Sequence, residues 1–189
     1  RLYVDATLGE GLRVVPAEKQ AHYLIHVMRV KKEDRICLFN GRDGEWSARL
    51  SEISKRNCVL SCDRKIAEQV SVPDVWLCFA PIKKTPVDYV VQKATELGVQ
   101  VLQPVFTRRT VVTRVNLERM HANAIEGAEQ SGRLNIPETR EPLSLEKLLS
   151  SWPKERRLLF CDEGGAAIPL AAALSRESDV PFAIITGPE

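Results

Sequence analysis

The sequence of 189 residues lacks most features that identify a function on their own. No apolar stretch approaches the roughly 20 residues of a membrane span and no basic-then-apolar leader opens it, so we expect a cytoplasmic protein without a membrane segment. The five cysteines are an odd number without a Cys-x-x-Cys pair, which disfavours a disulfide framework or a zinc knuckle. The Gly-x-Gly-x-x-Gly and phosphate-loop lysine motifs are absent, and with them the usual fingerprints of dinucleotide and nucleoside triphosphate binding.

Histidine is scarce, with three residues in the chain. His121 is the only one after residue 72, and nothing in that part resembles a Ser/His/Asp triad or a Cys/His pair. His22 and His26 have the i, i+4 spacing of a metal pair, but no third ligand is evident nearby and we predict no metal site. Chemistry in the C-terminal part would then use a cofactor that already carries the reactive group.

The net charge is only +2, but it is unevenly distributed. Residues 1–72 carry 13 basic and 10 acidic side chains, whereas residues 73–189 carry 14 and 15. This balance permits a nucleic-acid surface without requiring one.

Residues 1–70 have the pattern of a small β-barrel made of short strands. The five-residue loop 40–44, which contains two glycines, predicts a hairpin between strands at 35–39 and 45–50. A further strand is expected at 58–62, and a short helix at 16–27, where a proline suits the first turn.

Residues 73–189 alternate strands and helices, which predicts an α/β domain with a parallel sheet covered by helices. We expect strands at 75–80, 99–106, 157–161 and 180–186, and helices at 85–97, 116–131, 144–149 and 168–175. The chain therefore divides into two domains, 1–70 and 73–189.

Glycine turns follow two of these strands, at Gly164-Gly165 and at Gly187. In open α/β sheets, ligands bind beyond the carboxyl ends of the strands, where glycine lets the backbone approach a ligand closely. The alternative is that both are merely tight turns.

Basic pairs mark the same predicted edge of the sheet. Lys83-Lys84 and Arg108-Arg109 follow the first two strands of this domain, which favours an anionic substrate. Arg133 follows the helix that ends in Glu129-Gln-Ser-Gly132, either as a cation at a helix end or as a guanidinium fork for a phosphate or a base edge.

The first domain carries its own basic cluster, on and after the predicted helix and at the hairpin tip. Small barrels with basic loops commonly bind nucleic acid, although the interleaved acids also fit an ordinary solvated surface. The residues that we predict to contact RNA there are Arg29, Lys31, Lys32, Arg35 and Arg42.

Four motifs occur in one order and spacing: residues 92–99 (QKATELGV), 104–109 (PVFTRR), 129–133 (EQSGR) with Pro137, and 186–189 (TGPE). Together they resemble the bacterial 16S ribosomal RNA uridine-N3 methyltransferases of the SPOUT superfamily. The strand-rich N-terminal part is similar to the PUA-like RNA-binding domain of that family.

The resemblance implies an S-adenosylmethionine-dependent enzyme, working as a homodimer, that methylates N3 of one uridine in 16S rRNA within the small ribosomal subunit. It implies a small PUA-like β-barrel followed by a parallel-sheet α/β domain of the trefoil-knot type. The residues that it places at the cofactor are Asp162, Glu163, Gly164, Thr186, Gly187, Pro188 and Glu189. The residues that we assign to catalysis are Arg133 and Glu189, and the resemblance places Arg133 and the Lys84 region near an RNA-facing cleft. The predicted RNA contacts of this domain are the basic pairs Lys83-Lys84 and Arg108-Arg109. Glu189 could be the general base, hold its loop or orient the cofactor.

The family pattern continues beyond Gly187-Pro188-Glu189 with further glycines, a helix and the segment that makes the knot. We therefore expect the sequence to be part of a longer chain. Two other functions stay open on the residues alone: a non-catalytic RNA-binding or ribosome-assembly module, and a SPOUT enzyme that methylates the ribose 2′-oxygen.

Overall fold

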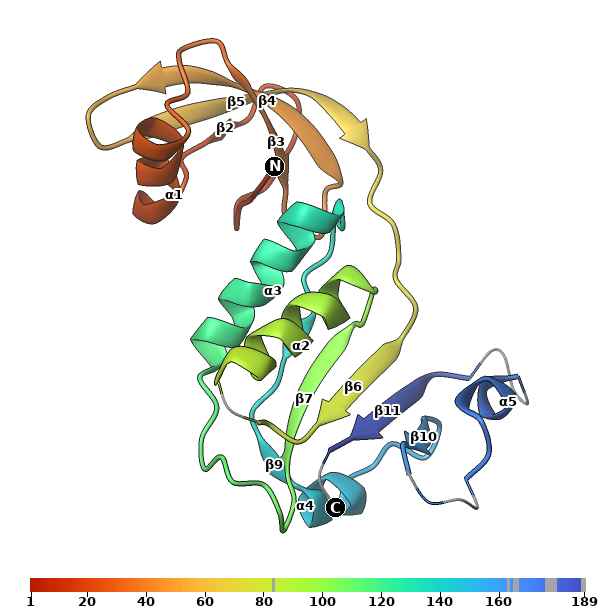
Figure 1. The fold of residues 1–189 in the computed structure, drawn as a ribbon. Helices are drawn as coiled ribbons and strands as arrows, with labels where there is room; N and C mark the ends of the chain where they lie inside the picture. The colour runs from red at the N-terminus through yellow and green to blue at the C-terminus, as the bar shows by residue number, and fades with distance from the viewer. Residues whose placement is uncertain (83, 163, 165–166, 176–179, 188–189) are drawn as a thin grey trace. The chain divides into compact units, whose positions relative to one another are not determined.

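The computed structural model describes residues 1–189 except 83, 163, 165–166, 176–179 and 188–189 (Figure 1). The chain forms two compact units. Unit 1 comprises Arg1–Ser71 together with Gly132–Asn135, and unit 2 comprises Val72–Ser131 together with Ile136–Glu189. Among the helices in the described part of the chain, none is long and apolar enough to cross a membrane.

Unit 1 is built on a mixed sheet in the order β1-β3-β4-β5-β2. Its elements are β1 (Leu2–Tyr3), β2 (Arg13–Val14), α1 (Glu18–His22), the π-helical turn η1 (Tyr23–Val27), β3 (Arg35–Phe39), β4 (Glu45–Ile53) and β5 (Cys58–Ala67). β3, β4 and β5 pair antiparallel, whereas β1 pairs parallel with β3. Register shifts between β4 and β5 bend the sheet, because each one disturbs the ladder and increases the local twist. The predicted hairpin is therefore confirmed, within a curled sheet whose concave side holds the core of the unit.

The hairpin loop between β3 and β4 is fixed by two side chains. The Asp43 carboxylate accepts hydrogen bonds from the backbone N–H of Leu8 (2.8 Å) and from the Asn40 amide (2.6 Å). The carbonyl oxygen of the Asn40 side chain accepts from the backbone N–H of Arg42 and of Asp43, both at 2.9 Å. The loop thus ties the hairpin to the N-terminal segment, and the bond from Leu8 lowers the pKa of Asp43 below its usual value.

Unit 2 is built on a parallel sheet in the order β10-β11-β6-β7-β8, with β9 also paired to β7. Its elements are β6 (Val75–Phe79), α2 (Lys84–Glu96), β7 (Val101–Phe106), α3 (Leu117–Ser131), β8 (Glu138–Thr139), β9 (Leu143–Ser144), α4 (Leu145–Ser150), β10 (Arg157–Phe160), α5 (Leu170–Leu174) and β11 (Phe182–Thr186). The predicted α/β class is confirmed. The short strands β2, β8 and β9 were not predicted, since two residues give too little pattern to detect.

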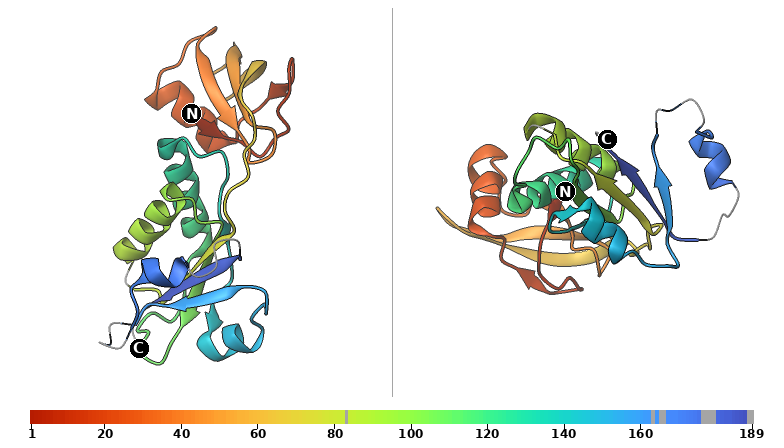
Figure 2. Two further views of the ribbon diagram at one scale, coloured as in Figure 1. Left: turned by 90° about the vertical axis from the view of Figure 1, so that its right-hand side faces the viewer. Right: turned by 90° about the horizontal axis from the view of Figure 1, so that it is seen from below.

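Helices cover both faces of this sheet. α2 and α3 lie on one face and α4 lies on the other (Figure 2). The core under α2 and α3 consists of Phe79, Val91, Ala94, Leu102, Met120 and Ala124. The core under α4 consists of Cys78, Val105, Leu148, Ala183 and Ile185. The successive β6 residues Cys78 and Phe79 therefore pack into cores on opposite faces, as expected for a strand buried on both sides.

The helix ends agree with the local sequence signals. Gly98 and Gly132, with φ of 92° and 80°, follow α2 and α3. The Ser144 hydroxyl caps α4 by accepting from the backbone N–H of Lys147 (3.2 Å). These glycine and serine positions confirm the predicted ends of the helices.

We expect Asp43→Ala to lower the free energy of unfolding by about 1–2 kcal/mol at neutral pH, because the Leu8 and Asn40 donors lose their acceptor. Since the pKa of Asp43 is lowered in the folded state, its contribution is present above its unfolded pKa and is lost as the pH falls through the folded value. The difference in the free energy of unfolding between Asp43→Ala and the wild type should therefore become smaller below about pH 4. Urea denaturation at pH 7 and pH 3 measures both values.

The matched control is Asp5→Ala. This carboxylate is mostly exposed and lies 3.6 Å from the Arg42 guanidinium. Its removal should therefore change the free energy of unfolding by less than about 0.5 kcal/mol. Equal stabilities for the Asp43 and Asp5 variants would show that the hairpin loop does not depend on the Asp43 bonds.

Candidate functional site

The candidate site lies where the strand order of unit 2 reverses. β6 leads outward through β7 to β8, and the chain then returns to place β11 between β10 and β6. Thr186 at the end of β11 is paired with Phe79 at the end of β6. Because the strands are parallel, their carboxyl ends meet at one edge, and such a reversal is where ligands bind in open α/β sheets.

A cavity of about 300 Å³ opens at this edge. The residues that line it come from β7, β10, β11, α4 and the loops after β6 and β7: Ala80, Val105, Thr107, Arg108, Leu145, Glu146, Phe160, Ile185, Thr186 and Gly187. Its volume is at the lower end of the range of about 300–1,000 Å³ typical of small-molecule sites. The lining is mostly apolar, with Arg108 and Glu146 as its charged members.

Gly187 and Ala80 are in close contact in the wall of this cavity. The φ of Gly187 is 150°, and a Cβ added there would be 2.4 Å from the Cβ of Ala80. The Ala80 N–H donates to the carbonyl of Thr186 (3.0 Å), which holds the two strand ends together. A residue larger than glycine would therefore force this part of the wall apart.

The loop after β10 has an ordered turn of its own. The backbone N–H of Gly164 donates to the Asp162 carboxylate (2.9 Å), so Asp162 holds the turn. Of the other residues predicted at the cofactor, Glu163, Pro188 and Glu189 lie outside the described residues, as does Lys83 among those predicted to contact RNA.

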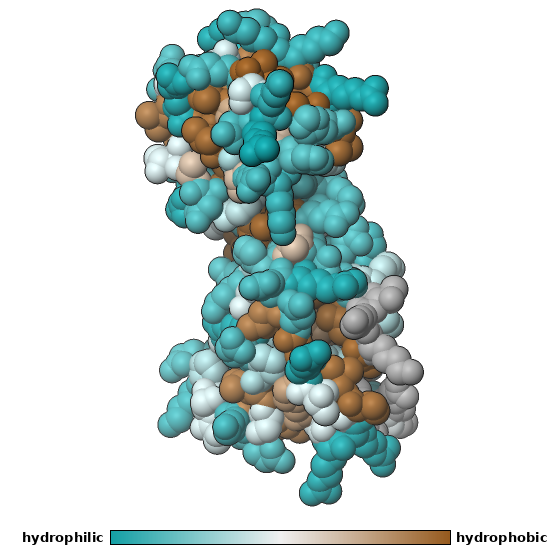
Figure 3. Space-filling model, turned by 90° about the vertical axis from the view of Figure 1, so that its left-hand side faces the viewer, coloured by the Kyte–Doolittle hydropathy of each residue, from teal (hydrophilic) through white to brown (hydrophobic). Residues whose placement is uncertain are grey.

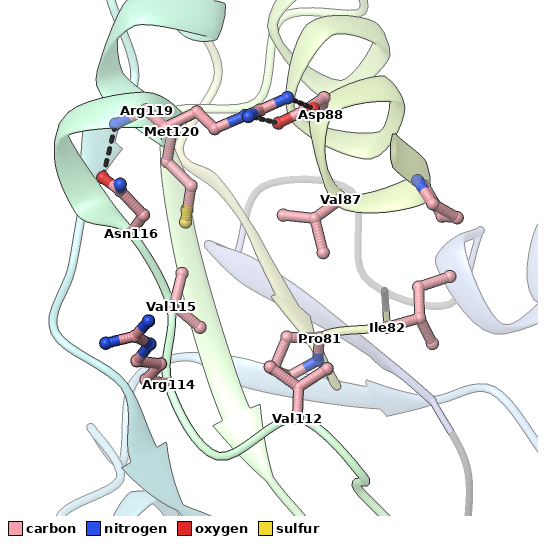
Figure 4. Close-up of a pocket in the computed structure, with 11 residues that line it drawn as sticks. Pro81, Ile82, Val87, Asp88, Val112, Arg114, Val115, Asn116, Arg119 and Met120 are labelled. Atoms are coloured by element: carbon pink, nitrogen blue, oxygen red, sulfur yellow. Dashed lines mark hydrogen bonds and ion pairs between the residues drawn. The ribbon is translucent and has the colours of Figure 1, made fainter. Parts of the chain in front are cut away.

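A second cavity, of about 510 Å³, lies at the start of α2 and α3 (Figure 4). Its lining residues are Pro81, Ile82, Pro86, Val87, Asp88, Val112, Arg114, Val115, Asn116, Arg119 and Met120. In Figure 4, Met120, Val87 and Val112 border the hollow, and the ion pair of Arg119 with Asp88 closes one rim. The space-filling view in Figure 3 shows one face of unit 2, on which apolar side chains are exposed among hydrophilic ones.

The rim of the second cavity is electrically balanced. Asp88 accepts from both sides of the Arg119 guanidinium, with Nε at 2.9 Å, and from the Asn123 amide at 2.7 Å. These bonds lower the pKa of the Asp88 carboxyl and raise that of Arg119. Asn116 accepts from the backbone N–H of Arg119 (2.9 Å) and so fixes the start of α3.

The basic residues of unit 1 fall into two groups. Arg35 and Arg42 are exposed but lie 3.7 and 3.6 Å from the carboxylates of Asp63 and Asp5. Arg29, Lys31 and Lys32 are exposed, and the described part of the chain offers them no ion pair. This second group therefore has charge available for an anion.

Arg133 has a different environment from the other predicted site residues. It belongs to the segment of unit 1 that follows α3, and its carbonyl accepts from the guanidinium of Arg1 (3.2 Å). Burial lowers the pKa of Arg133 to about 10. It does not line the cavity at Gly187, and a catalytic role for it stays a prediction.

The structure thus brings together Arg108, Thr186 and Gly187 in one cavity. Lys84 begins α2 and Arg109 follows Arg108 in the loop after β7, near the same edge. Phe160 and Glu146 also line this cavity and were not predicted from the sequence. Phe160 ends β10 and could have been found as a residue at a strand end, whereas nothing in the sequence singled out Glu146.

Metal binding has no candidate group in the described part of the chain, where no cluster of three or more His, Cys, Asp or Glu side chains could hold an ion. The imidazoles of His22 and His26, tilted by 46° with centroids 4.7 Å apart, have no third ligand among the described residues.

Comparison with known proteins gives two family matches. Residues 69–189 match the RNA methyltransferase domain, and residues 16–61 match the RNA methyltransferase PUA domain. Among curated relatives, the ribosomal RNA small subunit methyltransferase E of Rickettsia conorii is 29% identical over 194 residues, covering 100% of this chain and 78% of its own. The enzyme of the same name from Synechocystis is 30% identical over 175 residues, covering 90% and 57%.

A solved structure supports the same family. The small subunit methyltransferase E from Neisseria gonorrhoeae, crystallised with S-adenosylmethionine, superposes with a TM-score of 0.89 at 25% identity and covers 100% of this chain and 78% of its own. The predicted resemblance and fold are thereby confirmed. More than half of the chain matches the RNA methyltransferase domain, and the chain belongs to the RNA methyltransferase family, with the PUA domain of that family in its N-terminal part.

Proposed function

We propose that the protein transfers the methyl group of S-adenosylmethionine to N3 of a uridine in 16S rRNA of the small ribosomal subunit. The observation that carries the proposal is the cavity at the reversal of strand order, which lies within the region matched by the RNA methyltransferase domain. The names of the relatives and the S-adenosylmethionine in the Neisseria gonorrhoeae structure point to the same cofactor and substrate.

The residues around this cavity suit the methyl donor. The close contact of Gly187 with Ala80 leaves no room for a side chain at this point of the wall. The ring of Phe160, which is 62% exposed, offers an apolar surface to a purine, and the Glu146 carboxylate offers a counter-charge to a cationic ligand. When bound, S-adenosylmethionine would supply a methyl group on a sulfonium cation, and the neutral thioether S-adenosylhomocysteine is the leaving group.

Uridine N3 carries a proton that must leave when the methyl group is added. As the proton leaves, negative charge develops on the uracil ring until the methyl group is transferred, and oriented cationic donors in a site without bulk water stabilise such charge. Arg108 is the described cation of the cavity, and we assign it this role. Glu189 and Arg133 remain the predicted catalytic residues, and Thr186, Gly187 and the loop 162–165 the predicted cofactor contacts.

We assign the first contact with rRNA to the exposed cations of unit 1, Arg29, Lys31 and Lys32, with Arg35 and Arg42 as weaker contributors because each already has an acidic partner. In unit 2, Lys84 and Arg109 remain predicted RNA contacts, as does Lys83, which lies outside the described residues. We also propose that the complete protein is a homodimer, which sedimentation equilibrium of the full-length chain tests.

The function is tested with the full-length chain, labelled S-adenosylmethionine and small subunits from cells that lack the modification. We expect label in 16S rRNA, and mass spectrometry of the digested nucleosides should identify 3-methyluridine. Methyl on the ribose would instead indicate a 2′-O-methyltransferase. Binding of rRNA without any methyl transfer would indicate a non-catalytic module.

Gly187→Ala is expected to weaken S-adenosylmethionine binding by about 10-fold or more, because relief of the contact with Ala80 displaces the cavity wall. Isothermal titration calorimetry measures the affinity. Gly98→Ala is the control: Gly98 also has a positive φ, of 92°, but an added Cβ meets nothing within 4 Å. Both variants carry backbone strain, and a similar affinity in both would remove Gly187 from the cofactor site.

Replacing Lys31 and Lys32 by alanine should weaken rRNA binding and reduce the slope of log affinity against log salt by about 2, since two phosphate contacts are lost. Filter binding at several salt concentrations gives the slope. The control removes Arg13 and Lys65, which are ion-paired to Glu52 and Glu68 and should contribute little. Equal slopes in both double variants would place the RNA surface elsewhere.

A further inference from the structure

We propose that the outer face of α1 and η1 binds unpaired nucleotides of the rRNA, with their bases stacked on the side chains of His22, Tyr23 and His26. This inference rests on the proposed function, because it names the form of RNA that unit 1 recognises. Cations alone attract any polyanion, whether its bases are paired or free. Aromatic side chains add a preference for strands whose bases can be stacked on a protein surface.

The helical segment formed by α1 and η1, residues 18–27, packs on one side of the unit 1 sheet (Figure 1). Ala21 and Leu24 belong to the buried core of the unit. Because these inner side chains are held in the core, the outer side chains are presented on a fixed backbone. The side chains that this arrangement leaves exposed on and after the segment are His22, Tyr23, His26, Val27 and Met28.

The rings on this face offer flat surfaces to a base. The imidazoles of His22 and His26, one helical turn apart, have centroids 4.7 Å apart and are tilted by 46°. Tyr23, next to His22 in the chain, is 50% exposed, and Val27 and Met28 extend the exposed apolar area. Aromatic side chains exposed in this way suit bases of any sequence, because every base has a π face.

The backbone after η1 places a cation directly behind these rings. Arg29 has a φ of 53°, in the left-handed region that favours glycine. The turn is fixed by two backbone bonds, from the N–H of Met28 to the carbonyl of Tyr23 (2.9 Å) and from that of Val30 to the carbonyl of Leu24 (3.1 Å). Residues held in such costly conformations cluster at sites that contact ligands, which fits a binding role for the Arg29 side chain.

The acidic residues of the next turn are engaged in bonds within unit 1. Glu33 is ion-paired to Arg49 (3.0 Å), and the Asp34 carboxylate accepts from the backbone N–H of Lys31 (2.7 Å). The side chains of Lys31 and Lys32 are exposed and have no ion-pair partner in the described part of the chain. The charge beside the rings therefore favours a polyanion, and the rings favour a polyanion with free bases.

The first test measures RNA binding by the full-length chain without S-adenosylmethionine. Tyr23→Ala should weaken binding of a single-stranded RNA of about 16 nucleotides by about 5-fold or more, because a stacked base loses its partner. The slope of log affinity against log salt should stay unchanged, since stacking releases no counterions. Tyr23→Phe should keep the wild-type affinity within about 2-fold, because the ring remains. Fluorescence anisotropy at several salt concentrations measures these values.

The matched control is Tyr89→Ala. Tyr89 is 62% exposed on α2 in unit 2, and its loss should change the affinity by less than about 2-fold. A duplex that contains the same strand should bind the wild type and Tyr23→Ala equally, because its bases are not free. Equal affinities of the wild type and Tyr23→Ala for the single strand would overturn the proposal, as would the same loss for the duplex. If the single strand binds as expected but the wild type forms no 3-methyluridine, it is the proposed function that fails.

The second test uses the wild-type chain and so does not depend on how a variant folds. The same single strand with 5-iodouridine in place of uridine is irradiated in the complex, and the cross-linked peptide is identified by mass spectrometry. We expect cross-links at His22, Tyr23 or His26, because iodouracil joins to an aromatic ring that lies against it. Cross-links confined to residues outside 18–32 would overturn the assignment of this face.

Discussion

The parallel pairing of β11 with β6 is the interaction on which the site depends. It brings the last described strand of the chain beside the first strand of unit 2, with Thr186 opposite Phe79. Ala183 and Ile185 are buried against the face covered by α4, so sliding β11 along β6 by one residue would turn them toward the other face. The register that packs the core therefore also fixes the contact of Gly187 with Ala80.

The charges of the molecule are divided between positioning and binding. Arg119 is committed to Asp88, and Arg156, whose side chain is 9% exposed, is committed to Asp74 and packs on Trp76 with its Cζ 3.9 Å from the ring centroid. Ion pairs of this kind fix loops and strand ends and leave little net charge for a ligand. Lys31 and Lys32 are exposed and have no ion-pair partner in the described part of the chain. Their charges can therefore attract an anion at long range.

The elements of the fold could be predicted because their signals are local. Gly98 ends a helix, Ser144 begins one, and the loop 40–44 turns a hairpin, each through backbone geometry within a few residues. The order of the strands depends on contacts between distant parts of the chain. The local sequence of residues 157–186 does not show that β11 pairs with both β10 and β6. Thr186 and Gly187 could be predicted as strand-end residues, whereas Glu146 joins the cavity only through the packing of α4.

Arg133 illustrates why a motif does not by itself assign a role. The sequence allowed either a helix-end cation or a fork for a phosphate, and both readings require a guanidinium near water. Its side chain is instead partly buried, and the loss of hydration lowers its pKa. A pKa of about 10 still leaves it protonated at neutral pH. The motif 129–133 therefore ends in an arginine that is partly buried and charged, and its part in the reaction stays a prediction.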